Sequence, residues 1–183
     1  MPFITPDKWT VNPKTTLVVR FTYPDNNGSE EGVQWAGFRF PPQNIIRINK
    51  LGLEPARNTA VRDICLKSPA EFTDFIFMDR DVRPCDESDF FLTLDTDLAS
   101  CMCESRSMLS WANPAAFHLP LSRIRRKVLE AMVGPWFKRP LTADGCSYES
   151  CECVYFLKRA LELGFTSSHA GWARHDSEGS HGH

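Results

Sequence analysis

The sequence predicts an α/β domain with a partly parallel sheet, and three observations lead to that class. Residues 74–78 (DFIFM) form a continuous apolar run of strand length, which is typical of a strand buried on both faces. Residues 15–21 (TTLVVRF) form a second strand-like run, rich in β-branched side chains. Residues 149–163 have the pattern of a helix, with Gly164 at its C-terminal end. Strands interspersed with helices favour parallel pairing.

The other elements are predicted from local patterns. Turn-forming, acidic and Gly-rich residues, and then Pro41-Pro42, indicate a long surface loop over residues 24–43. Apolar residues recur at spacings of three and four over residues 121–132, which favours an amphipathic helix that ends at Gly134-Pro135. The remaining predictions are a short strand at 45–48, a helix that Pro55 opens and Ser68-Pro69 ends, and a weaker strand at 97–102.

Length and composition indicate one ordinary globular domain. The chain has 183 residues, with 42% hydrophobic and 24% charged, so it is not mostly disordered. We expect a single domain over residues 1–175 and a frayed polar tail over 176–183. The formal net charge of -2 argues against nucleic acid as the main partner.

The sequence also predicts a compartment. No apolar run approaches membrane-spanning length, so we expect no transmembrane segment. The N-terminus lacks the layout of a secretion signal, and the seven cysteines are an odd number. Reduced thiols in a cytoplasmic protein are the simplest interpretation of that pattern.

The most informative motif is Asp79-Arg80-Asp81, which directly follows the apolar run 74–78. Side chains two positions apart in extended chain point to the same side, so both carboxylates can face one ligand. Ligands of open α/β sheets bind at the carboxyl ends of the strands. Two hard oxygen donors suit Mn²⁺ or Mg²⁺, which share their coordination sphere with water and substrate phosphates. An acidic turn at a strand end is the competing interpretation of a lone Asp-x-Asp.

Four segments together resemble the nucleotide-sugar-dependent glycosyltransferases of the GT-A fold. Residues 52–58 (GLEPARN) look like the start of the helix that precedes the metal-binding strand of that family, and 74–84 (DFIFMDRDVRP) like the strand with its Asp-x-Asp. Residues 134–145 resemble the acceptor-side segment, and 152–165 the Glu-Asp-x-x-Phe helix. The resemblance covers roughly residues 50–175. It implies a GT-A-like, Rossmann-related, mostly parallel sheet flanked by helices.

The resemblance also implies a set of site residues. The metal ligands would be Asp79, Asp81 and the late His175, and the general base would be Glu152 or, one turn earlier, Glu149. The nucleotide-sugar donor would contact Arg57, Asp79 and Asp25, and the hydroxyl-bearing acceptor (a glycan, a lipid or a small molecule) would contact Trp136, Asp144 and Gly145.

Two departures from the family pattern bear on activity. Cys153 stands where inverting members commonly carry the acid that acts as general base, and a thiol would do that work poorly. Retaining members need no such base, because the leaving phosphate can serve. Only about one strand and a loop precede Arg57, so the donor pocket is abbreviated.

Other clusters offer alternatives. Asp95 and Asp97 form a second Asp-x-Asp, which we interpret as turn and cap residues. Cys101 and Cys103 face one side of a strand and keep a zinc site possible, whereas within a helix Cys151 and Cys153 would point about 200° apart. Buried free thiols explain them more simply. A basic run, Arg123, Arg125, Arg126 and Lys127, is typical of a solvated helix face.

The sequence therefore predicts metal-dependent transfer of a sugar from a nucleotide-diphosphate sugar to a hydroxyl acceptor. Two alternatives stay open. One is a non-catalytic module that binds nucleotide or sugar on the same fold. The other is a cysteine-rich interaction domain stabilised by zinc.

Overall fold

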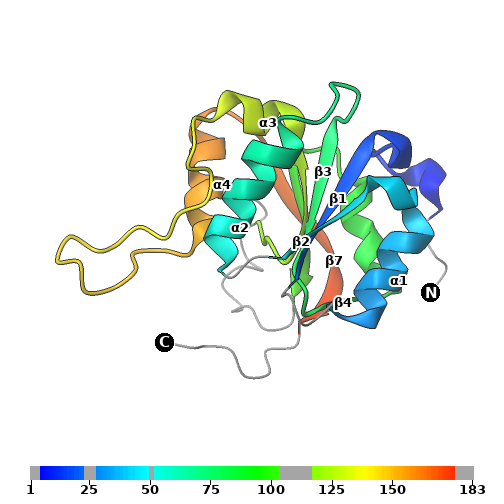
Figure 1. The fold of residues 1–183 in the computed structure, drawn as a ribbon, viewed down its shortest axis with the longest axis horizontal. Coiled ribbons are helices and arrows are strands. Elements are labelled where there is room, and N and C mark those ends of the chain that lie inside the picture. Colours follow the sequence, from blue (N-terminus) through cyan, green and yellow to red (C-terminus); the bar gives the residue numbers. More distant parts are fainter. Residues whose placement is uncertain (1–4, 23–27, 50–51, 104–116, 176–183) are drawn as a thin grey trace.

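The fold was analysed in a computed structural model that describes residues 5–22, 28–49, 52–103 and 117–175. These residues form a seven-stranded sheet in the order β2-β1-β3-β6-β5-β7-β4 (Figure 1). The strands are β1 (Thr16–Thr22), β2 (Ile45–Asn49), β3 (Asp74–Met78), β4 (Val82–Pro84), β5 (Leu98–Cys103), β6 (Leu121–Arg125) and β7 (Ser167–His175). The α-helices are α1 (Glu30–Arg39), α2 (Leu53–Thr59), α3 (Arg126–Ala131) and α4 (Glu152–Glu162). A π-helical turn, η4 (Ala60–Cys65), extends α2, and short 3₁₀ segments are η1 (Pro6–Lys8), η2 (Pro13–Thr15), η3 (Pro42–Asn44) and η5 (Asp86–Thr93).

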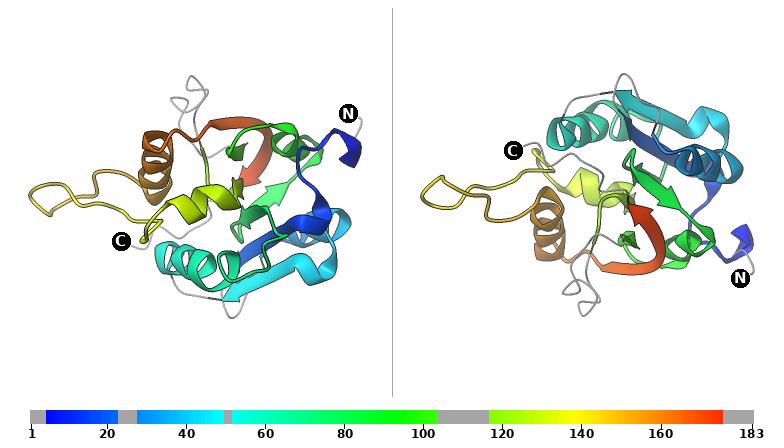
Figure 2. Two further views of the ribbon diagram at one scale, coloured as in Figure 1. Left: turned by 90° about the horizontal axis from the view of Figure 1, so that it is seen from above. Right: turned by 90° about the horizontal axis from the view of Figure 1, so that it is seen from below.

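The sheet is mixed, so the prediction of a mostly parallel, GT-A-like sheet is wrong. Strand β1 pairs in parallel with β2 and β3, and β5 pairs in parallel with β7. Strand β6, however, is antiparallel to both β3 and β5, and β4 is antiparallel to β7. The sheet curls from end to end, and its covering helices are few and short (Figure 2). The parallel pattern expected from the sequence therefore describes only part of the sheet.

Strand β6 is the main reason for this error. Residues 121–132 were predicted to be one helix, but the chain is a strand to Arg125 and a helix only from Arg126. The first four residues of β6 are all buried, because the strand lies between β3 and β5 in the middle of the sheet. Apolar spacings of three and four arise by chance across a boundary between a buried strand and a helix.

Helix α1 corrects the predicted loop over residues 24–43. The Ser29 hydroxyl accepts a hydrogen bond from the backbone N–H of Gly32 at 3.0 Å, which caps the helix. Trp35 and Ala36 are buried against the sheet. Glycines and acidic residues suggested a loop, but the cap and the apolar face outweigh their composition.

Alternate side chains of β1 and β3 enter two separate apolar clusters, one on each face of the sheet. Val19 and Phe77 belong to the cluster under α2, α3 and α4. Val18 and Ile76 belong to the cluster under α1 and η5. Figure 1 shows these helices on opposite sides of the sheet. This confirms that the run 74–78 is a strand buried on both faces, because every side chain of β3 is buried.

Strand β7 lies between β5 and β4 in the sheet, and the sequence analysis did not predict it. Its residues 167–173 pair with β5, and residues 173–175 pair with β4. An irregularity in the pairing with β5 lies near Gly171, whose φ is +80°. The strand brings its last residue, His175, to the register position opposite Val82. None of the helices in the described ranges is long and apolar enough to cross a lipid bilayer.

Candidate functional site

Three predicted site residues meet in a buried ion network beyond the end of β3. The Arg57 guanidinium lies between two carboxylates and donates to both oxygens of Asp79, at 2.8 and 2.7 Å from Nη2. Its Nη1 donates to the carboxylate of Glu152, the first residue of α4. The side chain of Arg57 is only 1% exposed. The network therefore ties α2, the end of β3 and the start of α4 together inside the protein.

The charge of Arg57 is secured by its partners. Burial alone lowers the pKa of the Arg57 guanidinium. The charges of Asp79 and Glu152 and the hydrogen bonds to Asp79 raise it by more than burial lowers it, so the pKa lies above its ordinary value. One cation thus faces two anions, and the network is negative overall. Because Arg57 is buried, it positions these two carboxylates and does not itself reach a ligand in solvent.

Asp81 and His175 form the second, more accessible part of the site. The Oδ1 atom of Asp81 lies 3.3 Å from Nε2 of His175, and both side chains are partly exposed. Burial raises the pKa of the Asp81 carboxyl, but the hydrogen bond and the charge of His175 outweigh it, so this pKa lies below its ordinary value. The structure therefore brings together two residues that are far apart in the sequence, one oxygen donor and one nitrogen donor.

The turn that carries Asp81 is held from two sides. The backbone N–H of Asp79 donates to the Pro120 carbonyl at 2.8 Å. The backbone N–H of Ser29 donates to the Arg80 carbonyl at 2.7 Å, and the Ser29 hydroxyl donates to the Val82 carbonyl. Ser29, which also caps α1, thus fixes the path of the chain next to Asp81.

The donor set fits a divalent cation that shares its sphere with a substrate. A carboxylate oxygen suits Mn²⁺ or Mg²⁺, whereas an imidazole nitrogen suits transition metals rather than Mg²⁺, so this pair of donors fits Mn²⁺ better than Mg²⁺. Across the described ranges, no group of three or more His, Cys, Asp or Glu side chains is gathered for a metal. Both oxygens of Asp79 accept from Arg57, so this carboxylate serves the buried network.

The predicted acceptor residues lie elsewhere. Asp144 and Gly145 are exposed on a loop that projects away from the sheet, as the yellow segment in Figure 1 shows. The Asp144 carboxylate accepts from the Thr142 hydroxyl and the backbone N–H of Cys146, which is the pattern of a turn residue. Glu149 is exposed on the same loop. The structure does not bring these side chains to Asp81 and His175.

Trp136 is held by the protein rather than offered to a ligand. Its indole N–H donates to the Leu129 carbonyl at 3.1 Å, and its backbone N–H donates to Oδ1 of Asn58 at 2.9 Å. Asn58 also bonds both backbone groups of Phe137. The sequence pattern included Asn58 only as part of a motif, and its role as a clamp on residues 136–137 depends on a contact between distant segments. Asp25, the remaining predicted donor contact, lies outside the described residues.

The second Asp-x-Asp combines an exposed residue, Asp95, with a buried one, Asp97, and both form ion pairs. Asp95 pairs with Arg125 at 2.5 Å, and Asp97 pairs with Lys127 at 2.6 Å. Asp97 Oδ2 also accepts from the backbone N–H of Thr166 at 3.0 Å. These contacts are those of turn and cap residues.

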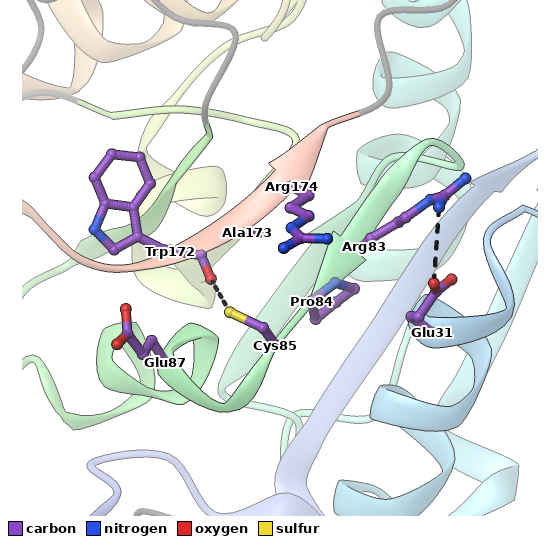
Figure 3. A pocket seen from close by; sticks show the side chains of 8 residues that line it. All are labelled: Glu31, Arg83, Pro84, Cys85, Glu87, Trp172, Ala173 and Arg174. Atoms are coloured by element: carbon purple, nitrogen blue, oxygen red, sulfur yellow. Dashed lines mark hydrogen bonds and ion pairs between the residues drawn. The ribbon is translucent and has the colours of Figure 1, made fainter. Parts of the chain in front are cut away.

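Sequence reasoning missed a cavity of about 610 Å³ along the β4–β7 edge. Arg83 and Arg174, which are register partners on the two strands, both line it, and Glu31 pairs with Arg83 at 3.9 Å (Figure 3). The other lining residues are Pro84, Cys85, Glu87, Trp172 and Ala173. The cavity lies along β4 and β7. Asp81 directly precedes β4, and His175 is the last residue of β7. No local pattern could have found it, because three of its eight lining residues belong to the unpredicted β7.

The fold and site define a mixed-sheet α/β protein with a buried arginine–carboxylate network and an adjacent Asp–His pair. No protein-family model and no curated protein sequence matches the chain. Among solved structures, the chain is similar to the crystal structure of A197 from STIV, with a TM-score of 0.53 and 13% sequence identity. The match covers 87% of this chain and 80% of A197. At that identity the likeness shows a shared fold and nothing further.

Proposed function

We propose that the protein binds a nucleotide-diphosphate sugar with a divalent cation at Asp81 and His175 and transfers the sugar to a hydroxyl acceptor. The observation that carries the proposal is the distance of 3.3 Å between the side chains of Asp81 and His175. Asp81 is two residues after Asp79, which belongs to the buried network with Arg57 and Glu152. The resemblance of residues 52–58 and 74–84 to nucleotide-sugar glycosyltransferases supports the same chemistry. This resemblance lies in the motif residues, because the sheet itself is mixed and not the mostly parallel sheet that the family pattern implied.

The two parts of the site have different roles in this proposal. Asp81 and His175 hold the cation, which when bound offsets the charge of the diphosphate leaving group. Arg57 and Asp79 fix the backbone from which Asp81 projects, because Asp79 is only two residues away and is locked by two hydrogen bonds. Positioning of this kind keeps the ligands in place before the donor arrives.

In the transfer step, the acceptor hydroxyl oxygen forms a bond to the anomeric carbon of the sugar. The bond between that carbon and the diphosphate oxygen breaks, and the diphosphate leaves with the electron pair. The hydroxyl proton goes to the leaving diphosphate, because Glu152 is already engaged by Arg57 and Glu149 lies on the projecting loop. In this proposal, the acceptor would occupy the cavity beside β4 and β7.

One observation favours a second candidate, a module that binds the nucleotide sugar without turnover. Glu152, the best base that the sequence offers, has its carboxylate held by a buried guanidinium. Cys153, in the position where inverting members of the family commonly carry the general base, is itself buried. Donor binding with no release of free sugar would identify this module.

Calorimetric titration with UDP, GDP and their sugars, with and without Mn²⁺, tests the proposal. The exchange Asp81→Asn should weaken metal-dependent binding at least about tenfold, because it removes an anionic ligand. Asp95→Asn is the matched control, since it alters the other Asp-x-Asp at an exposed position and should leave binding unchanged. Hydrolysis of the bound sugar nucleotide separates the transferase from the binding module.

The proposal is refuted if no nucleotide binds in the presence of Mn²⁺, or if Asp81→Asn and Asp95→Asn bind equally well. Thermal unfolding of both variants checks that they are folded. Asp81 is partly exposed, so we expect its exchange to be tolerated.

A further inference from the structure

The side chains of Cys151 and Cys153 are in contact. Their Sγ atoms lie 2.6 Å apart. The sequence placed both residues inside a helix and predicted that they point apart. Cys151 is instead the N-cap of α4, with extended backbone angles (φ -73°, ψ 162°), and Cys153 is the second helical residue. The helical rule does not apply across a cap, because the capping residue lies outside the helix.

The pair combines an accessible thiol with a buried one. Cys151 is partly exposed, whereas Cys153 is 3% exposed within the apolar cluster under α4. Arg57 is close enough that the charge of Cys153 contributes to the raised pKa of the guanidinium, after its two carboxylate partners. Because Cys151 is the more accessible of the two sulfurs, an oxidant in solution reaches it first.

Cys65, Cys85, Cys101 and Cys146 are in different surroundings. Burial raises the pKa of the Cys65 and Cys101 thiols well above the ordinary value, so both stay protonated. Cys146 is exposed, and its Sγ contacts the Asp144 carbonyl. Cys85 is exposed, and its Sγ contacts the Trp172 carbonyl.

We propose that Cys151 and Cys153 form a reversible disulfide, with a low-molecular-weight disulfide such as oxidised glutathione as the oxidant. The Cys151 thiolate attacks one sulfur of glutathione disulfide, and one glutathione leaves as its thiolate. The Cys153 thiolate then attacks Sγ of Cys151 and displaces the second glutathione. Two cysteine thiols are oxidised and one glutathione disulfide is reduced to two thiols, which take up the two protons that the cysteines lose.

The disulfide would act on the buried network through Glu152. This residue lies between the two cysteines, and its carboxylate is one of the two partners of Arg57. Closing the Cys151–Cys153 bond constrains the backbone on both sides of Glu152. Oxidation would thus change the contact between the start of α4 and the end of β3, whether or not the protein binds a nucleotide sugar.

The test uses the full chain carrying Cys146→Ser. The tryptic peptide that ends at Lys158 contains three cysteines in the native sequence, and this exchange leaves only the pair. The folded protein is equilibrated with mixtures of reduced and oxidised glutathione and quenched with acid, and the peptide is analysed by mass spectrometry. The disulfide appears as the loss of two hydrogen atoms, and Cys85 provides an internal exposed reference.

We expect the pair to be oxidised at least about tenfold more extensively than Cys85 is capped by glutathione, because the second thiol is already in place. Dithiothreitol should restore both thiols. With Cys153→Ser added, Cys151 should instead keep a bound glutathione, since no second thiol displaces it. The proposal fails if the pair stays reduced, or retains glutathione with Cys153 present, in mixtures that fully cap Cys85.

Discussion

The exchange Arg57→Met tests the central feature of the site, the buried arginine between two carboxylates. The Arg57 side chain is 1% exposed, and those of Asp79 and Glu152 are 7% and 11% exposed. Removing the guanidinium breaks both ion pairs and leaves two desolvated carboxylates facing the space that it filled. Loss of one partner of a buried pair costs about 3–5 kcal/mol, so we expect a decrease of that size in the free energy of unfolding.

Urea unfolding at pH 7, followed by far-UV circular dichroism, measures this loss. Arg62→Met is the matched control, because Arg62 is on the same helical segment but its side chain is 63% exposed and pairs only with Asp63 at the surface. We expect it to change stability by less than about 0.5 kcal/mol. Adding Asp79→Asn to Arg57→Met should recover part of the loss, since it removes one of the two uncompensated charges.

The reasoning is refuted if Arg57→Met costs no more than Arg62→Met. It is also refuted if adding Asp79→Asn to Arg57→Met makes the protein less stable still. Either result would mean that the carboxylates are hydrated and do not depend on Arg57 for their charge.

Two further predictions concern the frame around the site. Burial raises the pKa of the Asp97 carboxyl, but the hydrogen bond from Lys127 outweighs it and holds this pKa below its ordinary value. The stabilisation from the ionised carboxylate is therefore complete above about pH 4, and it is lost as the pH falls through the lower pKa of the folded state. Asp97→Asn should therefore cost about 1–2 kcal/mol at pH 7, and urea unfolding at decreasing pH should show that cost shrinking below pH 4; a cost that is constant down to pH 3 contradicts this. A Cβ atom at Gly171, where φ is +80°, would lie 2.2 Å from the Glu87 carbonyl oxygen, so Gly171→Ala should cost about 2–5 kcal/mol in thermal or urea unfolding. Gly145→Ala, at φ +71° with open space around it, should cost only about 1 kcal/mol, and equal costs would show that the clash is relieved.

Several elements followed from local patterns alone. The apolar run 74–78 is a strand buried on both faces, and the helix ending before Gly164 is present, although it begins at Glu152 rather than at 149. The predicted loop over 24–43 and the predicted helix over 121–132 failed for one reason. Composition and spacing describe only what neighbouring residues favour, whereas burial between two strands or against a sheet decides what they form.

The site shows the same division between local and long-range information. The sequence by itself determined that two carboxylates follow a buried strand, because the motif Asp79-Arg80-Asp81 and the run before it are contiguous. Only the tertiary structure decided that Asp79 turns inward to Arg57, that Asp81 meets His175, and that a cavity lies beside them. These contacts depend on the direction and order of strands, and above all on β7. Strand order is set by packing across the whole sheet, which no periodicity within one segment records.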